Sequence, residues 1–415
     1  MNSHSAETAA ESSQFSVRPA TLAGITVVTV AMFLVTYFVT HRYEAEQAAL
    51  ARHAFARGEA ELNAGHPEKA AADLRTALFY SRDNRQYRLR LAQALAASGQ
   101  TDEAIAYFRG LWESEPGNGL INLELAKLAA HQHKIPEALR YYHGAIYGAW
   151  EENPIASRLQ SRLELIHFLL QENSKQQAES ELIAAAAVLP ENAALYTRVG
   201  DLFMKIPDYS RALGQYQLAL QVERQDADAM LGAGRAAFEL GRYRTAQRYL
   251  KDGLAASPGA DKGAREMLDT VDTIFNINPF QPRLSLSQRA GRVVSAFQQA
   301  GARLQQCAQS SGEHLDTVPP SDPQQPARHA QRRTASQSAT ASASPATPLQ
   351  QLYARWLQAK SNVTARNFRR NADLIYPTMD LVFDIEQQTA AKCGTPTGPD
   401  MALLLIARNR AGLEQ

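Results

Sequence analysis

The sequence predicts an all-α protein with three parts: a single N-terminal transmembrane helix, an α-solenoid superhelix, and a C-terminal helical domain interrupted by a disordered linker. A helical-hairpin pattern recurs six times in the first 258 of the 415 residues, and an uncharged stretch of 22 residues precedes it. The composition also favours helix, because hydrophobic residues make up 45% of the chain, alanine is abundant and β-branched runs are few.

Residues 1–18 are expected to form an N-terminal tail, and residues 19–40 follow it without a charge. As a helix, this stretch would be about 33 Å long, enough to cross a hydrocarbon core of about 30 Å. We therefore expect a single-pass helix that contacts the lipid bilayer through residues 19–40. A cleaved signal peptide is disfavoured because the stretch is long and no A-x-A site follows. The residues after it, HRYEAEQAALARHAFARGEAELNAG, predict a continuous amphipathic helix into the first repeat.

The repeated pattern occupies residues 41–258. The second helix of each unit is predicted to begin at an alanine, and the steps between successive alanines are 34, 34, 40, 34 and 34 residues. A large apolar residue follows four positions later. A fixed period of this length indicates stacked helical hairpins, each too small to bury its apolar face alone. The six alanines are Ala70, Ala104, Ala138, Ala178, Ala212 and Ala246.

This pattern resembles the tetratricopeptide repeat (TPR). The clearest stretches read AQALAASGQTDEAIAYFRGLWESEPGN and GAGRAAFELGRYRTAQRYLKDGLAASPGA, with a small residue (Ala92, Gly234) at the eighth position of the unit. The resemblance covers about residues 51 to 258 and implies a right-handed TPR superhelix whose first helices line a concave groove. It weakens in the fourth unit, where the bulky Ile166 stands at the eighth position, and in the family's aromatic at position four, which is mostly missing.

The resemblance also implies that the ninth and thirteenth positions of the units face the groove. Their side chains are polar and of mixed charge, which suits an extended peptide or protein partner bound through hydrogen bonds and ion pairs. An ordinary solvated helix face is the alternative. The candidate partner-binding residues are Gln93, Lys127, His131, His167, Asp201, Lys205 and Arg235.

The third step is six residues longer than the others, and Trp150 lies in the added segment. Trp150 could plug the junction between two repeats or mark a contact site for a partner. We favour the plug, because a tryptophan is usually well buried.

Beyond the repeats, residues 259–309 are expected to form capping and connecting helices. Residues 310–348 are rich in Ser, Ala, Pro and Gln without an apolar period, which predicts a disordered linker. Residues 349–415 predict a helical segment that packs with residues 284–307. Within it, Pro377 is expected to kink or interrupt the middle helix.

Cys307 and Cys393 are the only cysteines, and each lies at the end of a predicted helix, on opposite sides of the linker. We favour a disulfide between them over two separate buried thiols. Closing this loop of 86 residues would add about 4 kcal/mol on the chain-entropy model. A disulfide implies an oxidising compartment. We therefore expect most of the chain to be periplasmic or otherwise extracytoplasmic. The basic residues argue for the reverse orientation, since Arg18 precedes the span and three arginines follow it within about 20 residues.

We find no motif for catalysis: no glycine-rich phosphate loop, no HExxH and no nucleophile elbow. We therefore expect no enzymatic activity, no cofactor and no metal site. With 43 basic and 42 acidic side chains the formal net charge is +1, which gives no electrostatic case for a nucleic-acid partner.

Together these features favour a membrane-anchored TPR scaffold that binds and positions protein partners in a bacterial envelope assembly or export process. Three alternatives stay open. One is a cytoplasm-facing membrane adaptor, and another is a structural homo-oligomer. The third is an envelope enzyme whose C-terminal helices act on lipid or glycan. That enzyme would need titratable groups to converge in a pocket near Asp373, Asp380, Asp384 and Glu386.

Overall fold

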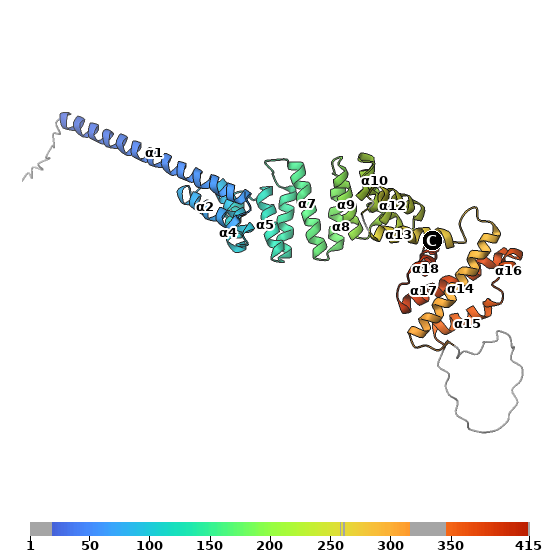
Figure 1. The fold of residues 1–415 in the computed structure, drawn as a ribbon. Coiled ribbons are helices and arrows are strands. Elements are labelled where there is room, and N and C mark those ends of the chain that lie inside the picture. The colour runs from blue at the N-terminus through green and yellow to red at the C-terminus, as the bar shows by residue number, and fades with distance from the viewer. Residues whose placement is uncertain (1–18, 258, 260–261, 316–345, 414–415) are drawn as a thin grey trace, which may run out of the picture. The chain divides into compact units, whose positions relative to one another are not determined.

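The computed structural model describes residues 19–257, 259, 262–315 and 346–413. These residues form helices joined by short turns, with one isolated β-bridge and no strand among them (Figure 1). The all-α prediction is therefore confirmed. The predicted tail, residues 1–18, and residues 316–345 of the predicted linker lie outside the described residues. The chain divides into two units, Met1–Glu181 and Leu182–Gln415, which are described separately.

The helices of unit 1 form successive antiparallel hairpins. The pairs α1 with α2, α3 with α4 and α5 with α6 pack along their length. The helices are α1 (Pro19–Asn63), α2 (Pro67–Tyr80), α3 (Arg85–Ala97), α4 (Thr101–Ser114), α5 (Gly119–His131), α6 (Ile135–Tyr147), α7 (Pro154–Gln171) and α8 (Lys175–Ala186), the last of which continues into unit 2.

The first helix is continuous over 45 residues, which confirms the predicted run from the apolar stretch into the first repeat (Figure 1). Its buried positions among the described side chains are Ala51, Ala54 and Gly58, where it packs on α2. The segment 24–50 is exposed almost throughout. An 18-residue window of this helix has a mean hydropathy of 1.7, so it is long and apolar enough to be a candidate membrane span.

Two features of the repeat explain why these residues form hairpins. The last residue of four units is Asn or Asp, and its side chain accepts a hydrogen bond from the backbone N–H three residues later, which caps the first helix of the next unit. The caps are Asn84, Asn118, Asn192 and Asp226. The second helices begin three residues earlier than predicted, so each of the six alanines is the fourth residue of its helix. All six are fully buried, so neighbouring helices approach closely there.

The small residue at the eighth position has a direct steric cause. A Cβ atom at Gly200 would lie 2.8 Å from the Tyr216 ring, and one at Gly234 would lie 2.7 Å from Leu250 Cγ. In each pair the large side chain comes four residues after the buried alanine of the second helix and fills the space that glycine leaves. The predicted close crossing of the two helices is therefore confirmed at these units.

Trp150 plugs the junction of the third repeat, as expected. A Cβ atom at Gly119 would lie 2.3 Å from Cε2 of the Trp150 ring, so the indole occupies the space that glycine leaves. The Nε1 of Trp150 donates to the Ala145 carbonyl at 2.8 Å. The added segment is anchored beside it, because the Gly119 N–H donates to the Ala149 carbonyl and the Ala149 N–H donates to the Gly117 carbonyl. The 40-residue step is thus accommodated by the backbone hydrogen bonds of Ala149 and by the Trp150 indole.

Replacing Trp150 with alanine is expected to lower the free energy of unfolding of unit 1 by about 2 kcal/mol, since a half-buried indole leaves a gap beside Gly119. Hydrogen exchange of the α5 amides would measure this change. Tyr147→Ala is the matched control, because Tyr147 is 72% exposed and should cost less than about 0.5 kcal/mol. Equal effects of the two substitutions would contradict the plug.

Unit 2 continues the hairpins and ends in a bundle. Its helices after α8 are α9 (Ala193–Lys205), α10 (Tyr209–Val222), α11 (Ala227–Glu239), α12 (Tyr243–Ala256), α13 (Lys262–Ile277), α14 (Leu286–Ser310), α15 (Pro348–Lys360), α16 (Ala365–Arg370), the 3₁₀ turn η2 (Ala372–Leu374), α17 (Ile375–Cys393) and α18 (Gly398–Leu413). Helix α13 packs on α11 and α12 and so covers the last hairpin, and α18 packs on α13.

The bundle is built around α14 and α17, with α15, α16 and α18 packed against one or both of them. Trp356 of α15 stacks on Phe297 of α14 with ring centroids 5.4 Å apart, and its Nε1 donates to the Phe297 carbonyl at 3.0 Å. Gly301 permits this approach, because a Cβ atom there would lie 2.3 Å from the indole. Residues 286–310 and 348–413 therefore share one core.

The predicted middle helix of the bundle is interrupted, but Pro377 is not the site of the break. The helix stops at Arg370, passes through Asn371 and η2, and resumes at Ile375. Pro377 lies in the first turn of α17, where its missing N–H has no helical partner to lose. The break lies one turn before Pro377, where a continued helix would bring the proline ring against the carbonyl of residue 373, so the proline still interrupts the helix as predicted. Within the break, the Asn371 side chain accepts a hydrogen bond from the Asp373 N–H at 3.1 Å.

Candidate functional site

The first helices of the hairpins in unit 1 share a polar face, which we call the first-helix face. On α1 and α3 it begins with an ion pair between Arg90 Nε and Glu59 Oε1 at 2.9 Å. Arg90 also donates through Nη1 to Gln93 Oε1 at 3.0 Å. Because the pair joins two successive first helices, Glu59, Arg90 and Gln93 lie on the same side of the hairpins.

The face continues on α5 and α7 with one lysine between two carboxylates. Lys127 Nζ lies 3.8 Å from Glu124 Oε1 and 3.7 Å from Glu164 Oε2. Burial raises the pKa of Glu124, the Lys127 ammonium opposes that rise, and the charge of Glu164 adds to it. Burial, together with the Glu164 charge, raises the pKa of the nearby Tyr142 to about 12. This part of the face carries two acids for one base.

The two histidines have different environments. His167 of α7 is half-buried, and its Nδ1 lies 2.7 Å from the Leu163 carbonyl, so that nitrogen carries the proton. His131 is the last residue of α5 and is exposed. Of these two side chains, His131 is therefore the one accessible to a partner.

In unit 2, two of the predicted residues, Asp201 and Arg235, act on the hydroxyl group of Tyr216. Tyr216 of α10 donates to Asp201 Oδ1 of α9 at 2.7 Å. Burial and this hydrogen bond raise the pKa of Tyr216, and the charge of Arg235 on α11 opposes the rise. Lys205, at the end of α9, is exposed. Asp201 and Arg235 thus flank the tyrosine that fills the gap at Gly200.

The sequence interpretation missed the partners of these residues. Arg90, Glu124 and Glu164 each lie three positions before a predicted residue: Gln93, Lys127 and His167. Residues three apart on a helix share a face, so the sixth position of each unit could have been read together with the ninth. The resulting face presents alternating charges that are already paired within the protein.

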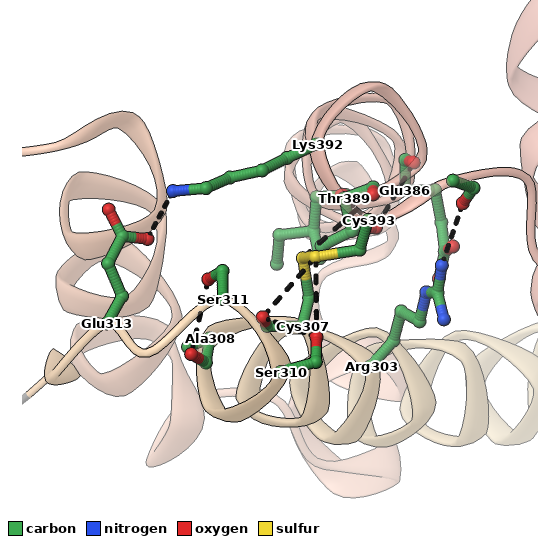
Figure 2. Close-up of a disulfide and its surroundings, with 12 residues drawn as sticks. Arg303, Cys307, Ala308, Ser310, Ser311, Glu313, Glu386, Thr389, Lys392 and Cys393 are labelled. Carbon is green, nitrogen blue, oxygen red and sulfur yellow. Dashed lines mark hydrogen bonds and ion pairs between the residues drawn. A yellow bond between two sulfur atoms is a disulfide. The ribbon is translucent and has the colours of Figure 1, made fainter.

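Figure 2 shows the second polar cluster, where the bundle is joined by a disulfide between Cys307 of α14 and Cys393 of α17. Their Cα atoms are 5.7 Å apart. Beside it, Lys392 forms an ion pair with Glu313 at 2.6 Å, and this ammonium lowers the pKa of Glu313 while burial opposes it. Glu313 is just before the stretch that lies outside the described residues, so the disulfide and the ion pair together hold the base of that stretch.

Glu386 lies on α17 between these contacts and the helix centre. It is fully buried, and neither carboxyl oxygen has a hydrogen-bond partner among the described residues. Burial raises the pKa of Glu386 to about 8; the charge of Asp400 adds to the rise, and the Arg303 guanidinium opposes it. Arg303 itself donates through Nη2 to the Gly394 carbonyl at 3.0 Å (Figure 2). The carboxyl is therefore protonated at neutral pH.

The acidic residues of the enzymatic alternative do not converge. Asp373 lies in η2 rather than on α17, and Asp384 is ion-paired with Arg355 at 3.1 Å. Glu386 is buried away from solvent. Neither cavity described in unit 2 is lined by any of the four. Among the described residues, no group of three or more His, Cys, Asp or Glu side chains could hold a metal ion.

Comparisons with known proteins agree with the repeat pattern. A tetratricopeptide repeat family model matches residues 55–119, and a second model of the same repeat matches residues 95–147. Comparison with curated proteins finds no match.

Several solved structures resemble the fold. The structure reported for Pseudomonas aeruginosa pilF is 20% identical, covering 52% of this chain and 95% of that one, with a TM-score of 0.38. PilW, described as a widely conserved type IV pilus biogenesis factor, is 18% identical, covering 53% and 97%, with a TM-score of 0.38. YrrB, described as a TPR protein with an unusual peptide-binding site, is 14% identical, covering 45% and 93%, with a TM-score of 0.36. Residues 55–147 therefore contain tetratricopeptide repeats, and the same hairpin spacing continues to residue 258.

Proposed function

We propose that this chain is a membrane-anchored scaffold that binds protein partners on the first-helix face and positions them in a bacterial envelope assembly or export process. TPR proteins are generally interaction scaffolds rather than enzymes, and the fold supports that general role. The single observation that carries the finer proposal is α1, which joins an apolar segment and the first repeat in one helix.

The exposure of the apolar segment supports an anchor. The exposed fraction of its large side chains ranges from 58% for Val30 to 74% for Phe33. The 18-residue apolar window of this helix is 0% buried. A soluble core helix would be covered, because leaving this much apolar surface in water is costly. Hydrocarbon is the environment that removes that cost without a protein partner.

The continuity of α1 supports positioning as well as anchoring. Only 10 residues lie between Thr40, the end of the apolar stretch, and Ala51, the first residue buried against α2. In a helix these two positions are about 16 Å apart. A helix of that length has little freedom compared with a flexible linker, so the first repeat would be held near the bilayer.

The first-helix face supports partner binding through its paired charges. Each ion pair is partly exposed, so a partner side chain can exchange with it at small cost. In unit 1, the carboxylates of Glu124 and Glu164 share the single positive charge of Lys127. One negative charge is therefore left over and can pair with a cationic group of the partner. The proposed occupant is an extended segment of another protein.

Site-specific photocrosslinking in membranes tests this proposal. A photoreactive residue at His131 is expected to give a discrete protein adduct, because its side chain is exposed at the end of a first helix. Glu164→Lys should reduce the His131 adduct by at least about five-fold, because it replaces a carboxylate proposed to receive the partner's cationic group with a positive charge that repels that group. The matched control is a photoreactive residue at Glu113, which is exposed on the second helix α4. An equal adduct from Glu113, or none from His131, would reject the first-helix face as the binding site.

A further inference from the structure

A cavity of about 310 Å³ lies where the last hairpin of unit 2 meets its capping helix. Its walls come from the α11–α12 turn with the start of α12, the end of α13 with the loop that follows it, and α18. The side chains that matter below are Arg242, Arg244, Phe275, Asn278, Phe280 and Asn409. This cavity contains none of the first-helix face residues.

The cavity is positively charged. Arg242 and Arg244 are both exposed at its rim, and no Asp or Glu is among its lining residues. Arginines on second helices of unit 1 differ in this respect, since Arg75 pairs with Glu103 at 2.6 Å and Arg109 with Glu137 at 3.7 Å. No such pair forms for the two cavity arginines within the part of the chain that the structure describes. Burial raises the pKa of the lining residue Tyr243 to about 12; the charge of Glu239 adds to this rise and the charge of Arg408 opposes it.

The backbone adds to this charge rather than cancelling it. Helix α12 begins at Tyr243 with Arg242 as its N-cap, and no side chain caps its first turn. The N-terminal end of a helix carries a partial positive charge. On the opposite wall, the carbonyl groups of Phe275 and Asn278 at the end of α13 accept hydrogen bonds from Arg292 at 2.9 and 2.7 Å. Their partial negative charge is therefore already neutralised.

The other wall of the cavity is aromatic and extends outside it. Phe275 and Phe280 line the cavity, and Phe280 stacks on Tyr376 with ring centroids 5.4 Å apart. Tyr376 is 51% exposed. A ligand that entered between the arginines would therefore have a flat apolar surface beside its charged group.

Hydrogen bonds hold the cavity in shape. Asn409 Nδ2 of α18 donates to the Gly241 carbonyl at 3.2 Å, and Asn278 Oδ1 accepts from the Phe280 N–H at 2.9 Å. Gly241 has φ +68°, and a Cβ atom there would lie 2.8 Å from Asn409 Oδ1. The turn that carries Arg242 is thus fixed by α18, so little ordering is needed when a ligand binds.

We propose that this cavity binds a peptide segment that carries a carboxylate next to an aromatic residue. The guanidinium groups of Arg242 and Arg244 receive the carboxylate, for which the planar fork of arginine is suited. The Phe280–Tyr376 stack receives the aromatic ring. A partner held here would contact the end of the repeat array and the bundle of unit 2 at once, independently of any partner on the first-helix face.

Fluorescence anisotropy with the full chain in uncharged detergent micelles tests the proposal. The probe is the fluorescein-labelled peptide GSGEFE, used with a free and with an amidated C-terminus, so that side-chain and terminal carboxylates are distinguished. Saturable binding is expected, weaker at higher salt, and at least ten-fold weaker for the double variant Arg242→Ala/Arg244→Ala. The peptide GSGEGE should bind several-fold less tightly, and GSGKFK should not bind.

Arg248→Ala is the matched control, because Arg248 lies on the same helix, stacks on Tyr249 and does not line the cavity. It should leave binding unchanged. The single variant Arg244→Gln keeps the size of the side chain and should still weaken binding if the double variant fails to fold. The proposal is overturned if GSGEFE does not saturate, if Arg248→Ala weakens binding as much as the cavity variants, or if only vesicles of anionic lipid bind in an Arg242- and Arg244-dependent way.

Discussion

Replacing Glu386 with glutamine is expected to raise the free energy of unfolding of unit 2 by about 3 kcal/mol at pH 7. The carboxyl is fully buried without a hydrogen-bond partner among the described residues. Its pKa is raised to about 8, first by burial and then by the charge of Asp400, against the opposing charge of Arg303. Glutamine has nearly the same shape and carries no proton to lose.

The sign of the pH dependence follows from the two states of the chain. In the unfolded chain the pKa of this carboxyl is about 4.3. Between about pH 4.3 and pH 8 the folded chain therefore binds more protons than the unfolded chain, and stability falls as the pH rises. Each pH unit in that window removes about 1.4 kcal/mol. The advantage of glutamine should vanish near pH 4, where both states of the wild type are protonated.

Hydrogen exchange of the α14 and α17 amides between pH 4 and pH 8, corrected for the intrinsic exchange rate, measures this dependence. Asp384→Asn is the control on the same helix, because Asp384 is 49% exposed and its pair with Arg355 should contribute less than about 1 kcal/mol. A Glu386→Gln variant that is less stable than the wild type at pH 7, or that keeps the wild-type slope, would show that the carboxyl is ionised and paired in solution.

The repeat could be predicted from the sequence because its cause is local and periodic. Buried alanines at fixed steps allow close helix packing, and the glycine at Gly200 or Gly234 is required by one named side chain in the same hairpin. The continuous α1 and the Cys307–Cys393 disulfide could also be predicted. The sequence after the apolar stretch contains no helix breaker before the first repeat, and the chain has only two cysteines. The close packing of helices at small residues with a fixed spacing therefore accounts for most of the fold.

The polar contacts could not be predicted as well, because they depend on which helices become neighbours. The link from Lys127 to Glu164 joins two hairpins across the irregular 40-residue step, and no fixed period gives its register. Glu386 was grouped with three exposed-looking acids, yet its neighbours Val382 and Ile385 are buried too. On a helix buried on several sides, spacing alone does not tell which polar residue faces the core.

Removing the disulfide with the double variant Cys307→Ala/Cys393→Ala is expected to lower the free energy of unfolding of the bundle by about 4 kcal/mol. The bond closes a loop of 86 residues, and the unfolded chain gains the most entropy when such a long loop is released. Cys307 is buried, with 1% exposure, and alanine leaves only a small gap there. Hydrogen exchange of α14 and α17 again measures the change.

Reductant supplies the internal control for this prediction. The wild type in excess reductant should unfold at the same denaturant concentration as the double variant, and the variant should not respond to reductant at all. If the wild type were equally stable with and without reductant, the two thiols would be unbonded in solution, and the Lys392–Glu313 ion pair would be left as the contact at the base of the loop.

If α1 is the proposed membrane anchor, the same bond also decides which side of the membrane the repeats face. A disulfide persists in an oxidising compartment and is reduced in the cytoplasm. In intact cells, the partly exposed Cys393 should therefore react with a membrane-impermeant thiol reagent only after reduction, if the repeats face the periplasm or the exterior. Labelling without reduction, and only after the membrane is permeabilised, would place the repeats in the cytoplasm. Partners for the first-helix face would then be sought among cytoplasmic proteins, in agreement with the arginines that follow the span.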